Sequence, residues 1–213
     1  MIESLRTRVV RKVPDRIRFD GRVLLLTEDP ALLHRQLAGE DLPFDASAPV
    51  GSPTHPKLRD NISTDEITPA YICYYFDDTL GQFPYLGLKA GEEFPLVRGS
   101  VRAGGFVASV AGTRRGKGSS REASPYAEMH AGIKIVIAES IERIYRENCQ
   151  NLGVFTSTDF SLIQRIRNGE EIELAELTRG EGGISRGIVE YGGLFNYNVA
   201  RLQGLVEVPV VTT

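Results

Sequence analysis

A short run of small, hydroxylic and charged residues occupies positions 116–122 and reads Gly-Lys-Gly-Ser-Ser-Arg-Glu. Glycines let the backbone approach a bound group closely, and the free N–H groups at the start of a following helix attract an anion. Ser119 and Ser120 supply hydroxyls, and the guanidinium of Arg121 can hold a carboxylate through two parallel hydrogen bonds. The run therefore predicts a cradle for a carboxylate or phosphate, with a hydroxyl beside it for proton transfer.

Simpler explanations of the same run exist. A serine ahead of an apolar, helix-periodic segment is often only a helix N-cap, and the run alone does not decide between a cap and a site. A phosphate-binding P-loop is disfavoured because only three residues separate Gly112 from Gly116 and because Gly118 follows Lys117. The neighbouring basic side chains lack the interleaved aromatic residues of a nucleic-acid surface. We therefore expect neither nucleotide nor nucleic acid as a ligand.

A second run, residues 59–70, is dense in carboxylates and hydroxyls and reads Arg-Asp-Asn-Ile-Ser-Thr-Asp-Glu-Ile-Thr-Pro-Ala. Asp, Asn, Ser and Thr side chains readily bond their own backbone, so a plain turn is the first explanation. The run indicates a functional site only when it is considered together with residues 116–122, which follow it in the chain.

Together, in this order and spacing, the two runs resemble the small subunits and carboxy-terminal domains of the aconitase and isopropylmalate dehydratase superfamily. The family pattern D-N-x-x-T-D-x-I-x-P-A is matched by residues 60–70, and G-x-G-S-S-R-E by residues 116–122. The likeness continues through V-I-A-x-S at residues 136–140 and an Asn-Cys pair at 148–149, and covers residues 55–160.

The resemblance implies a swivelling β/β/α domain that closes over the active site of a larger subunit, or fused domain, carrying a [4Fe-4S] cluster. The cluster iron would take the substrate hydroxyl as a Lewis acid, while Ser119 in alkoxide-like form removes a proton from the neighbouring carbon. Ser120, Arg121 and Gly118 would bind the substrate, and N–H groups of the loop would stabilise the ionised serine.

The second run, residues 59–70, carries two further residues under the same resemblance. Asp65 matches an aspartate that pairs with a histidine of the large subunit, and it is counted with Ser119 as catalytic. Thr68 stands where some members place another substrate-binding hydroxyl. Both roles come from the family pattern alone.

Two departures from the family bear on the substrate. Ala123 and Ser124 stand where the family has His-Ala, and residues 71–80 lack the arginine that often selects the substrate side chain. The aromatic residues 74–76 stand there instead. If they face the pocket, an isopropyl or methyl substituent fits better than a third carboxylate; the alternative places them in the core.

Composition restricts the cofactors and partners of the chain. Its 213 residues carry a formal net charge of −3, which gives no overall attraction to nucleic acid or to an anionic membrane. Cys73 and Cys149 are the only cysteines and form no CxxC pair, and His34, His55 and His130 show no ligand spacing, so no metal or cluster site is expected here. The cluster is expected on the partner chain.

The chain predicts an α/β fold with a mixed sheet. Residues 106–110 and 133–138 are apolar enough for strands, and each precedes a helical segment, over 124–131 and from Ser140 to Gly153 respectively. Val154 and Phe155 begin another strand. From Glu171 onward glycine pairs suggest strands and turns, with residues 205–211 as a final edge strand.

The amino-terminal region, residues 1–50, is interpreted as an addition to this fold. Residues 22–26 predict a strand, and Asp29-Pro30 begins a helix that Gly39 ends; a proline-rich connector follows. We therefore divide the chain into an extension over 1–50 and a swivel domain over 51–213. No apolar stretch approaches the ~20 residues that span a bilayer, and the amino terminus lacks a secretory pattern, so a cytoplasmic location is expected.

Two interpretations follow. The first is one component of a hydro-lyase or isomerase of the 3-isopropylmalate dehydratase type, as in leucine biosynthesis, acting on a malate-like 2-hydroxy di- or tricarboxylic acid with a cluster-bearing partner. The second is a non-catalytic carboxylate-binding module of the same fold that regulates a partner. The intact residues 119–121 favour the first.

Overall fold

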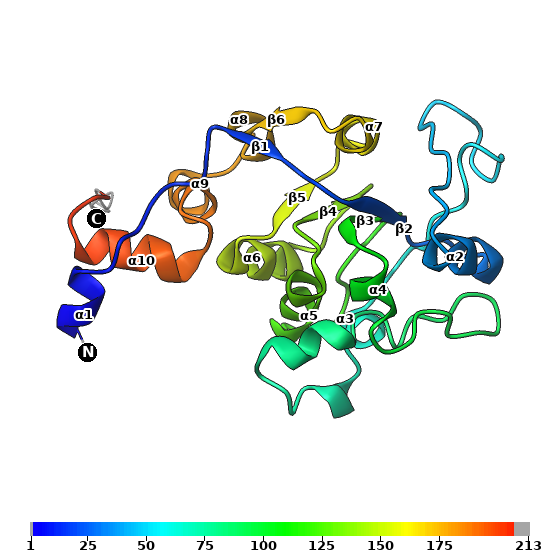
Figure 1. Ribbon diagram of the computed structural model, residues 1–213, viewed down its shortest axis with the longest axis horizontal. Coiled ribbons are helices and arrows are strands. Elements are labelled where there is room, and N and C mark those ends of the chain that lie inside the picture. The colour runs from blue at the N-terminus through cyan, green and yellow to red at the C-terminus, as the bar shows by residue number, and fades with distance from the viewer. Residues whose placement is uncertain (1, 207–213) are drawn as a thin grey trace.

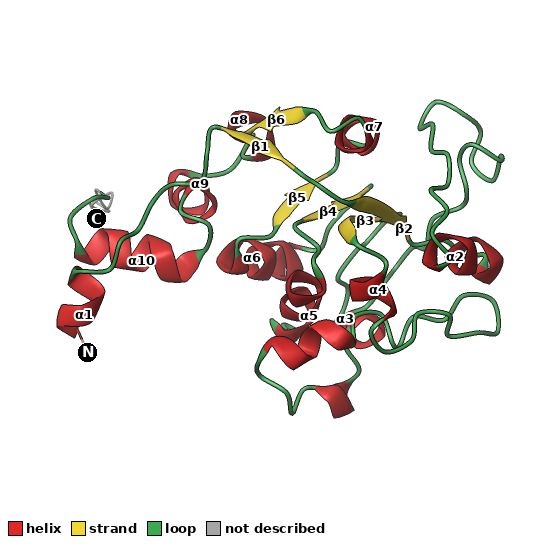
Figure 2. Cartoon of the chain, viewed as in Figure 1, coloured by secondary structure: helices red, strands yellow, loops and turns green. Residues whose placement is uncertain are grey.

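The computed structural model describes residues 2–206, and within them the chain folds around two small sheets (Figures 1 and 2). Strands β2 (Arg22–Leu25), β3 (Phe106–Ala111), β4 (Ile135–Ala138) and β5 (Phe155–Ser157) form a parallel sheet in that order. Strands β1 (Arg16–Arg18) and β6 (Glu171–Glu173) pair antiparallel in a second sheet. The predicted α/β class, with both kinds of strand pairing, is confirmed.

Helices cover both faces of the parallel sheet, which is why β3 and β4 are buried along their whole length and read as continuous apolar runs. On one face, Val136 and Ala138 pack with Tyr145 and Cys149 of α6 (Arg143–Leu152) in a cluster that adjoins α5 (Ala123–Ala131). On the other face, the alternate residues of β4 pack against α7 (Ser161–Arg167). The sheet is the centre of a three-layer core.

Most helix ends predicted from capping residues and glycines agree with the structure. Helix α2 (Pro30–Leu37) begins after Asp29, whose side chain accepts from the amide of Ala31. Helices α5 and α6 end at glycines in the left-handed conformation, Gly132 (φ 111°) and Gly153 (φ 78°). The predicted cap Ser140 is wrong: α6 starts after Glu142, and the Ser140 hydroxyl accepts from the amide of Arg114 at 2.8 Å.

The amino-terminal strand is part of the main sheet. Strand β2 pairs parallel with β3, with Val23 opposite Ala108 and Leu25 opposite Val110. This corrects the expectation of an appended strand and helix, because a boundary near residue 50 would cut through the parallel sheet. Long-range parallel pairing leaves no local mark in the sequence, so the error has a clear physical origin.

The carboxy-terminal region is helical where strands and turns were predicted. After β6 come α8 (Leu174–Leu177), α9 (Gly183–Glu190) and α10 (Leu194–Leu202). The glycine pairs lie at the starts of α9 and α10, where Gly182 and Gly193 are the N-cap residues, and do not form strand turns. The final strand predicted over 205–211 lies for the most part outside the described residues.

The remaining elements lie in the connections. They are α1 (Ile2–Arg6), α3 (Thr64–Ile67), η1 (Ala70–Ile72), η2 (Asp78–Gln82) and α4 (Ser100–Ala103). Helices α1, α9 and α10 lie together at one end of the molecule, away from the parallel sheet (Figure 1). Among residues 2–206, no helix has the length and apolar character needed to cross a membrane.

Candidate functional site

The two motif-bearing runs meet at the carboxyl ends of β3 and β4, the edge of a parallel sheet where ligands commonly bind. The loop after β3, residues 112–122, runs beside residues 60–67. Backbone hydrogen bonds join them: the amide of Thr64 donates to the carbonyl of Lys117 at 2.8 Å, and the amide of Gly116 donates to the carbonyl of Ile62 at 2.8 Å. Residues predicted as one site from two distant motifs are therefore neighbours.

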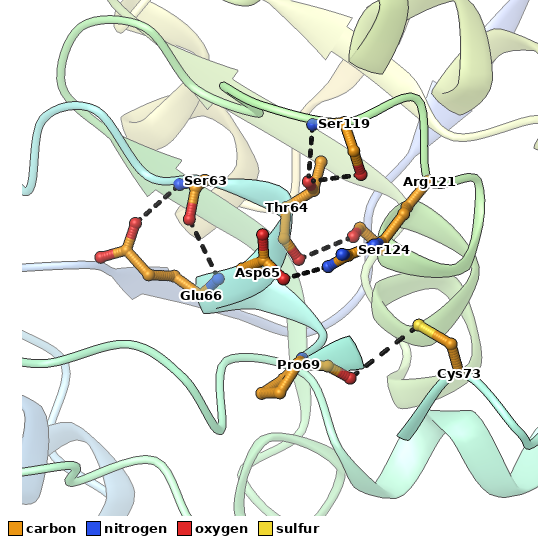
Figure 3. A network of polar contacts seen from close by, with 9 residues as sticks. All are labelled: Ser63, Thr64, Asp65, Glu66, Pro69, Cys73, Ser119, Arg121 and Ser124. Carbon is orange, nitrogen blue, oxygen red and sulfur yellow. Dashed lines mark hydrogen bonds and ion pairs between the residues drawn. The ribbon is translucent and has the colours of Figure 1, made fainter. Parts of the chain in front are cut away.

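A capping box fixes the run over residues 59–70 at the start of α3. The Ser63 hydroxyl accepts from the amide of Glu66 at 3.1 Å, and the Glu66 carboxylate accepts from the amide of Ser63 at 2.7 Å. Arg59 also holds Glu66, with Nη2 and Oε1 2.8 Å apart. The local turn expected from composition is thus present, and it sets the direction of Thr64 and Asp65 (Figure 3).

Ser119 lies exposed at the tip of the loop after β3, against the buried side chain of Thr64. The Ser119 amide donates to Thr64 Oγ1 at 3.2 Å, and the two hydroxyl oxygens lie 3.3 Å apart (Figure 3). Two contacts from one threonine therefore orient the predicted base. Thr64 was not predicted as a site residue, although the family pattern contains it immediately before Asp65.

Two glycines allow the loop to take this path. Gly118 has φ 112°, a conformation that residues with a Cβ rarely adopt, and a Cβ there would lie 3.4 Å from Thr64 Oγ1. Gly116 has φ 81°, and a Cβ at that position would collide with the ring of Tyr145. The glycines thus serve the turn and its close packing, while the substrate contact expected of Gly118 stays a prediction.

Arg121 and Asp65 form an ion pair across the two runs (Figure 3). The Asp65 side chain is 61% exposed and that of Arg121 29%, so both remain accessible at the surface that carries Ser119. Ser120 is exposed beside them, and its carbonyl accepts from the side-chain amide of Asn148 at 3.2 Å. Four predicted site residues, Ser119, Ser120, Arg121 and Asp65, are thus brought together.

Thr68 is not part of this exposed group. Its side chain is fully buried at the end of α3, and among the described residues its hydroxyl has no hydrogen-bond partner. Ser124, which stands where the family has Ala after its histidine, is also buried, and its hydroxyl donates to the carbonyl of Thr64 at 3.1 Å. Ser124 therefore stabilises the start of α3 through a buried hydrogen bond.

Comparisons with known proteins point to one family. The family model of the Aconitase C-terminal domain matches residues 91–158. The isopropylmalate/citramalate isomerase small subunit of Methanocaldococcus jannaschii is 34% identical, over 66% of this chain and 89% of that protein. The 3-isopropylmalate dehydratase small subunit of Pyrobaculum neutrophilum is 37% identical, over 65% and 90%. The chain belongs to the aconitase superfamily, among its small subunits.

A solved structure was also found. The crystal structure of 3-isopropylmalate dehydratase from Methanocaldococcus jannaschii is 28% identical and covers 67% of this chain and 89% of that one, with a TM-score of 0.48. About a third of this small subunit thus lies outside the alignment with that structure.

A cavity of about 350 Å³ opens next to the serine loop of this small subunit. Its lining combines the loop, through Glu122 and Ala123, with the aromatic segment after α3, through Tyr75 and Phe76. The segment is not core: Tyr74 is 84% exposed, Phe76 88%, and Tyr75 stacks on Phe83 at 5.3 Å between ring centroids. The exposure of residues 74–76 is against the core interpretation, and the lining of the cavity includes Tyr75 and Phe76 but not Tyr74.

The small subunit offers no ready metal site within residues 2–206, since no three His, Cys, Asp or Glu side chains gather there. Cys73 is exposed and Cys149 is buried, and both are free thiols. Burial raises the pKa of Cys149 well above its usual range, and the nearby charge of Glu128 acts in the same direction. Cys149 is therefore an inert packing residue.

Proposed function

We propose that this chain is the small subunit of a hydro-lyase of the 3-isopropylmalate dehydratase type, which removes water from, and returns it to, a malate-like 2-hydroxy acid. The observation that carries the proposal is the exposed Ser119 hydroxyl, held by Thr64, on the same surface as Arg121 and Ser120. The names of the relatives agree with this activity. The chain acts with a large-subunit partner.

The iron-sulfur cluster belongs on that partner. The exposed Cys73 and the buried Cys149 are not placed together to hold a cluster, and the described residues contain no other cysteine. On the partner, the cluster would supply a Lewis acid for the leaving hydroxyl. The work of the small subunit is the other half of the elimination, the removal of a proton from carbon.

In this half-reaction, Ser119 Oγ accepts the proton from the carbon next to the one that bears the hydroxyl. The electron pair of the broken C–H bond forms the double bond as the hydroxyl leaves, and addition of water reverses both changes. A carboxylate on the reacting carbon is held by Arg121, which can bind it through two parallel hydrogen bonds, and by Ser120. In this proposal, N–H groups of the loop stabilise the ionised serine.

The ion pair between Arg121 and Asp65 suggests how the two chains cooperate. While Asp65 holds Arg121, a substrate carboxylate must compete for the same guanidinium. A basic group of the large subunit, such as a histidine, pairs with Asp65 in this proposal and leaves Arg121 free for the substrate. Full substrate binding then requires the partner.

The cavity beside the loop indicates the kind of substituent. Its lining includes Phe76, Leu80, Tyr126 and Leu152, with Glu122 as the acidic member. An isopropyl or methyl group gains free energy from apolar surroundings, whereas a third carboxylate would meet the charge of Glu122. We therefore propose an alkyl-substituted malate as substrate. A cytoplasmic location stays a prediction.

The test combines the purified chain with candidate large subunits and follows the absorbance of the unsaturated acid. Ser119→Ala should lower kcat by about 10²-fold or more, the scale of a lost general base. Ser161→Ala, at the exposed start of α7, should leave it unchanged. Turnover by Ser119→Ala within threefold of the parent would remove Ser119 as the base, and a preference for citrate over isopropylmalate and 2-methylmalate would refute the apolar pocket.

A further inference from the structure

A fully buried ion pair lies directly beneath the serine loop. Arg115, four residues before Ser119, and Glu128 of α5 are both 0% exposed, and their side chains are in direct contact. Two phenols join the pair: the Tyr85 hydroxyl donates to one carboxylate oxygen of Glu128, and the Tyr145 hydroxyl donates to the other. The buried Ser109 hydroxyl also donates to the first of these oxygens, over a longer distance of 3.5 Å. We call Arg115, Glu128, Tyr85 and Tyr145 the buried network.

The buried network ties together four segments of the chain. Arg115 belongs to the loop after β3, Glu128 to α5 and Tyr145 to α6. Tyr85 belongs to the connection after η2, and its amide donates to the carbonyl of Ile67 at the end of α3 with a length of 2.7 Å. The network therefore links the serine loop to α5, to α6 and, through Tyr85, to the end of α3.

Stability alone does not explain these charges. A buried ion pair loses much hydration, and apolar side chains of similar volume commonly stabilise a fold as well or better. In the described part of the chain, Nε and Nη1 of Arg115 find no hydrogen-bond partner. The guanidinium carbon lies instead 5.1 Å and 5.5 Å from the ring centroids of Tyr85 and Tyr145. What the network provides is a defined position for Arg115.

The position of Arg115 sets that of the loop tip. Its amide donates to the carbonyl of Ser140 at 2.9 Å, and its carbonyl accepts from the amide of Glu142 at 2.8 Å. The next residue, Gly116, packs against the ring of Tyr145 so closely that no Cβ fits. From there only two residues lead to Ser119, whose amide is held by Thr64.

We infer that Arg115 and Glu128 are positioning residues that fix the serine loop, and with it Ser119, for proton transfer. The inference rests on the proposed function for its catalytic meaning. Its structural content, that the buried network restrains the loop, applies to the chain alone. Misplacing a reacting group by about 1 Å can cost about 10²-fold in rate, so a loosened loop has a measurable effect.

The test removes the polar network as a unit. The variant Arg115→Met/Glu128→Leu/Tyr85→Phe/Tyr145→Phe replaces all four polar groups by apolar ones of similar volume, so no buried charge is left alone. Hydrogen exchange of the Gly116 and Lys117 amides, bonded to Ile62 at 2.8 and 3.1 Å, reports on the loop. We expect retained thermal stability and exchange at these amides at least about tenfold faster than in the parent.

Two further variants keep the outcome decisive. Tyr85→Phe/Tyr145→Phe removes only two oxygens and should still fold, with exchange of the loop amides several-fold faster. Arg165→Met/Glu176→Leu, which removes a partly exposed pair 2.7 Å apart between α7 and α8, should leave the loop unchanged. Loop exchange within twofold of the parent in a folded network variant would overturn the inference.

The same variants separate this inference from the proposed function. With an active large subunit, the network variant should lose about ten- to a hundredfold in kcat with a smaller change in KM. If no partner gives turnover, or if Ser119→Ala keeps it, the proposed function fails while the exchange experiment still decides whether the network holds the loop. If turnover is normal although the loop exchanges faster, the positioning role is refuted and the function stands.

Discussion

At the scale of single residues, the hydroxyl of Thr64 is the side-chain group that contacts both the amide and the hydroxyl of Ser119. It accepts from the Ser119 amide, and its oxygen lies 3.3 Å from Ser119 Oγ. With one lone pair engaged by the amide, the Thr64 proton remains available for Ser119 Oγ. As the serine ionises, that contact becomes a hydrogen bond to a charged oxygen, which is stronger than one to a neutral oxygen.

Thr64→Val should therefore impair catalysis while preserving shape. A hydrogen bond to a charged group contributes about 1.5–3 kcal/mol, which corresponds to a loss of about ten- to a hundredfold in kcat. Thr64→Ser keeps the hydroxyl and should retain most of the activity. The measurement is kcat with the large subunit present, with thermal unfolding as a control for the fold. Equal kcat in the valine and serine variants would contradict the role of the hydroxyl.

Most of these site residues were predicted from the sequence, but not all of them. Ser119, Ser120, Arg121 and Asp65 follow from motif spacing, and they lie on one surface; their roles in the reaction stay predictions. Thr68 lies in the same motif but is buried, because the short α3 turns it inward. The capping box determines which hydroxyl of the motif faces Ser119. The spacing of residues in the sequence does not give the geometry of that capping box.

At the scale of elements, local signals were reliable where a single residue decides the backbone. Asp29, Gly132 and Gly153 end or begin helices as predicted. The glycine pairs after residue 180 led to the wrong prediction of strands and turns, because glycine permits both a strand turn and the start of a helix. Packing favours the helices, since Tyr191 at the end of α9 and Tyr197 and Ala200 of α10 form a small buried cluster.

Gly116 provides an experiment at this scale. Alanine there must adopt φ 81° and would also collide with the Tyr145 ring. Strain in the left-handed region costs about 1–2 kcal/mol and overpacking a further 1–3 kcal/mol, so we expect a total loss of about 2–5 kcal/mol in the free energy of unfolding.

Gly180 is a matched control. It has the same φ of 81°, and no described atom lies within 4 Å of a Cβ built there. Gly180→Ala should therefore cost only the strain, about 1–2 kcal/mol. Urea unfolding of both variants gives the difference. Equal losses would show that the contact of the loop with Tyr145 is loose, against the restraint proposed for the buried network.

At the scale of the whole molecule, contacts between distant segments were beyond the sequence. Strand β2 pairs with β3 across some eighty intervening residues, and Arg115 reaches Glu128 through the interior. In a linear sequence Arg115 looks like part of a solvated basic run with Arg114 and Lys117. It is buried because the loop after β3 descends between α5 and α6, a path that only the assembled sheet defines.

Burial of the network has a consequence for stability at high pH. Burial, reinforced by the charge of Glu128, raises the pKa of the Tyr85 and Tyr145 phenols far above their ordinary value near 10. In the unfolded chain both phenols lose their protons as the pH passes about 10. Their contribution to stability is therefore complete below about pH 10 and is lost as the pH rises above it, because only the unfolded state ionises there.

Each phenol that stays protonated in the folded state steepens this loss by about 1.4 kcal/mol per pH unit. Tyr85→Phe/Tyr145→Phe should remove both contributions and flatten the decline of the free energy of unfolding between pH 10 and 11.5. Tyr71→Phe/Tyr74→Phe, at positions 70% and 84% exposed, should leave the slope unchanged. Urea unfolding at several pH values, together with tyrosinate absorbance, gives both quantities. If Tyr85 and Tyr145 ionise in the folded chain together with the exposed tyrosines, the phenols are not sealed in the interior, and the buried network cannot hold the serine loop as inferred.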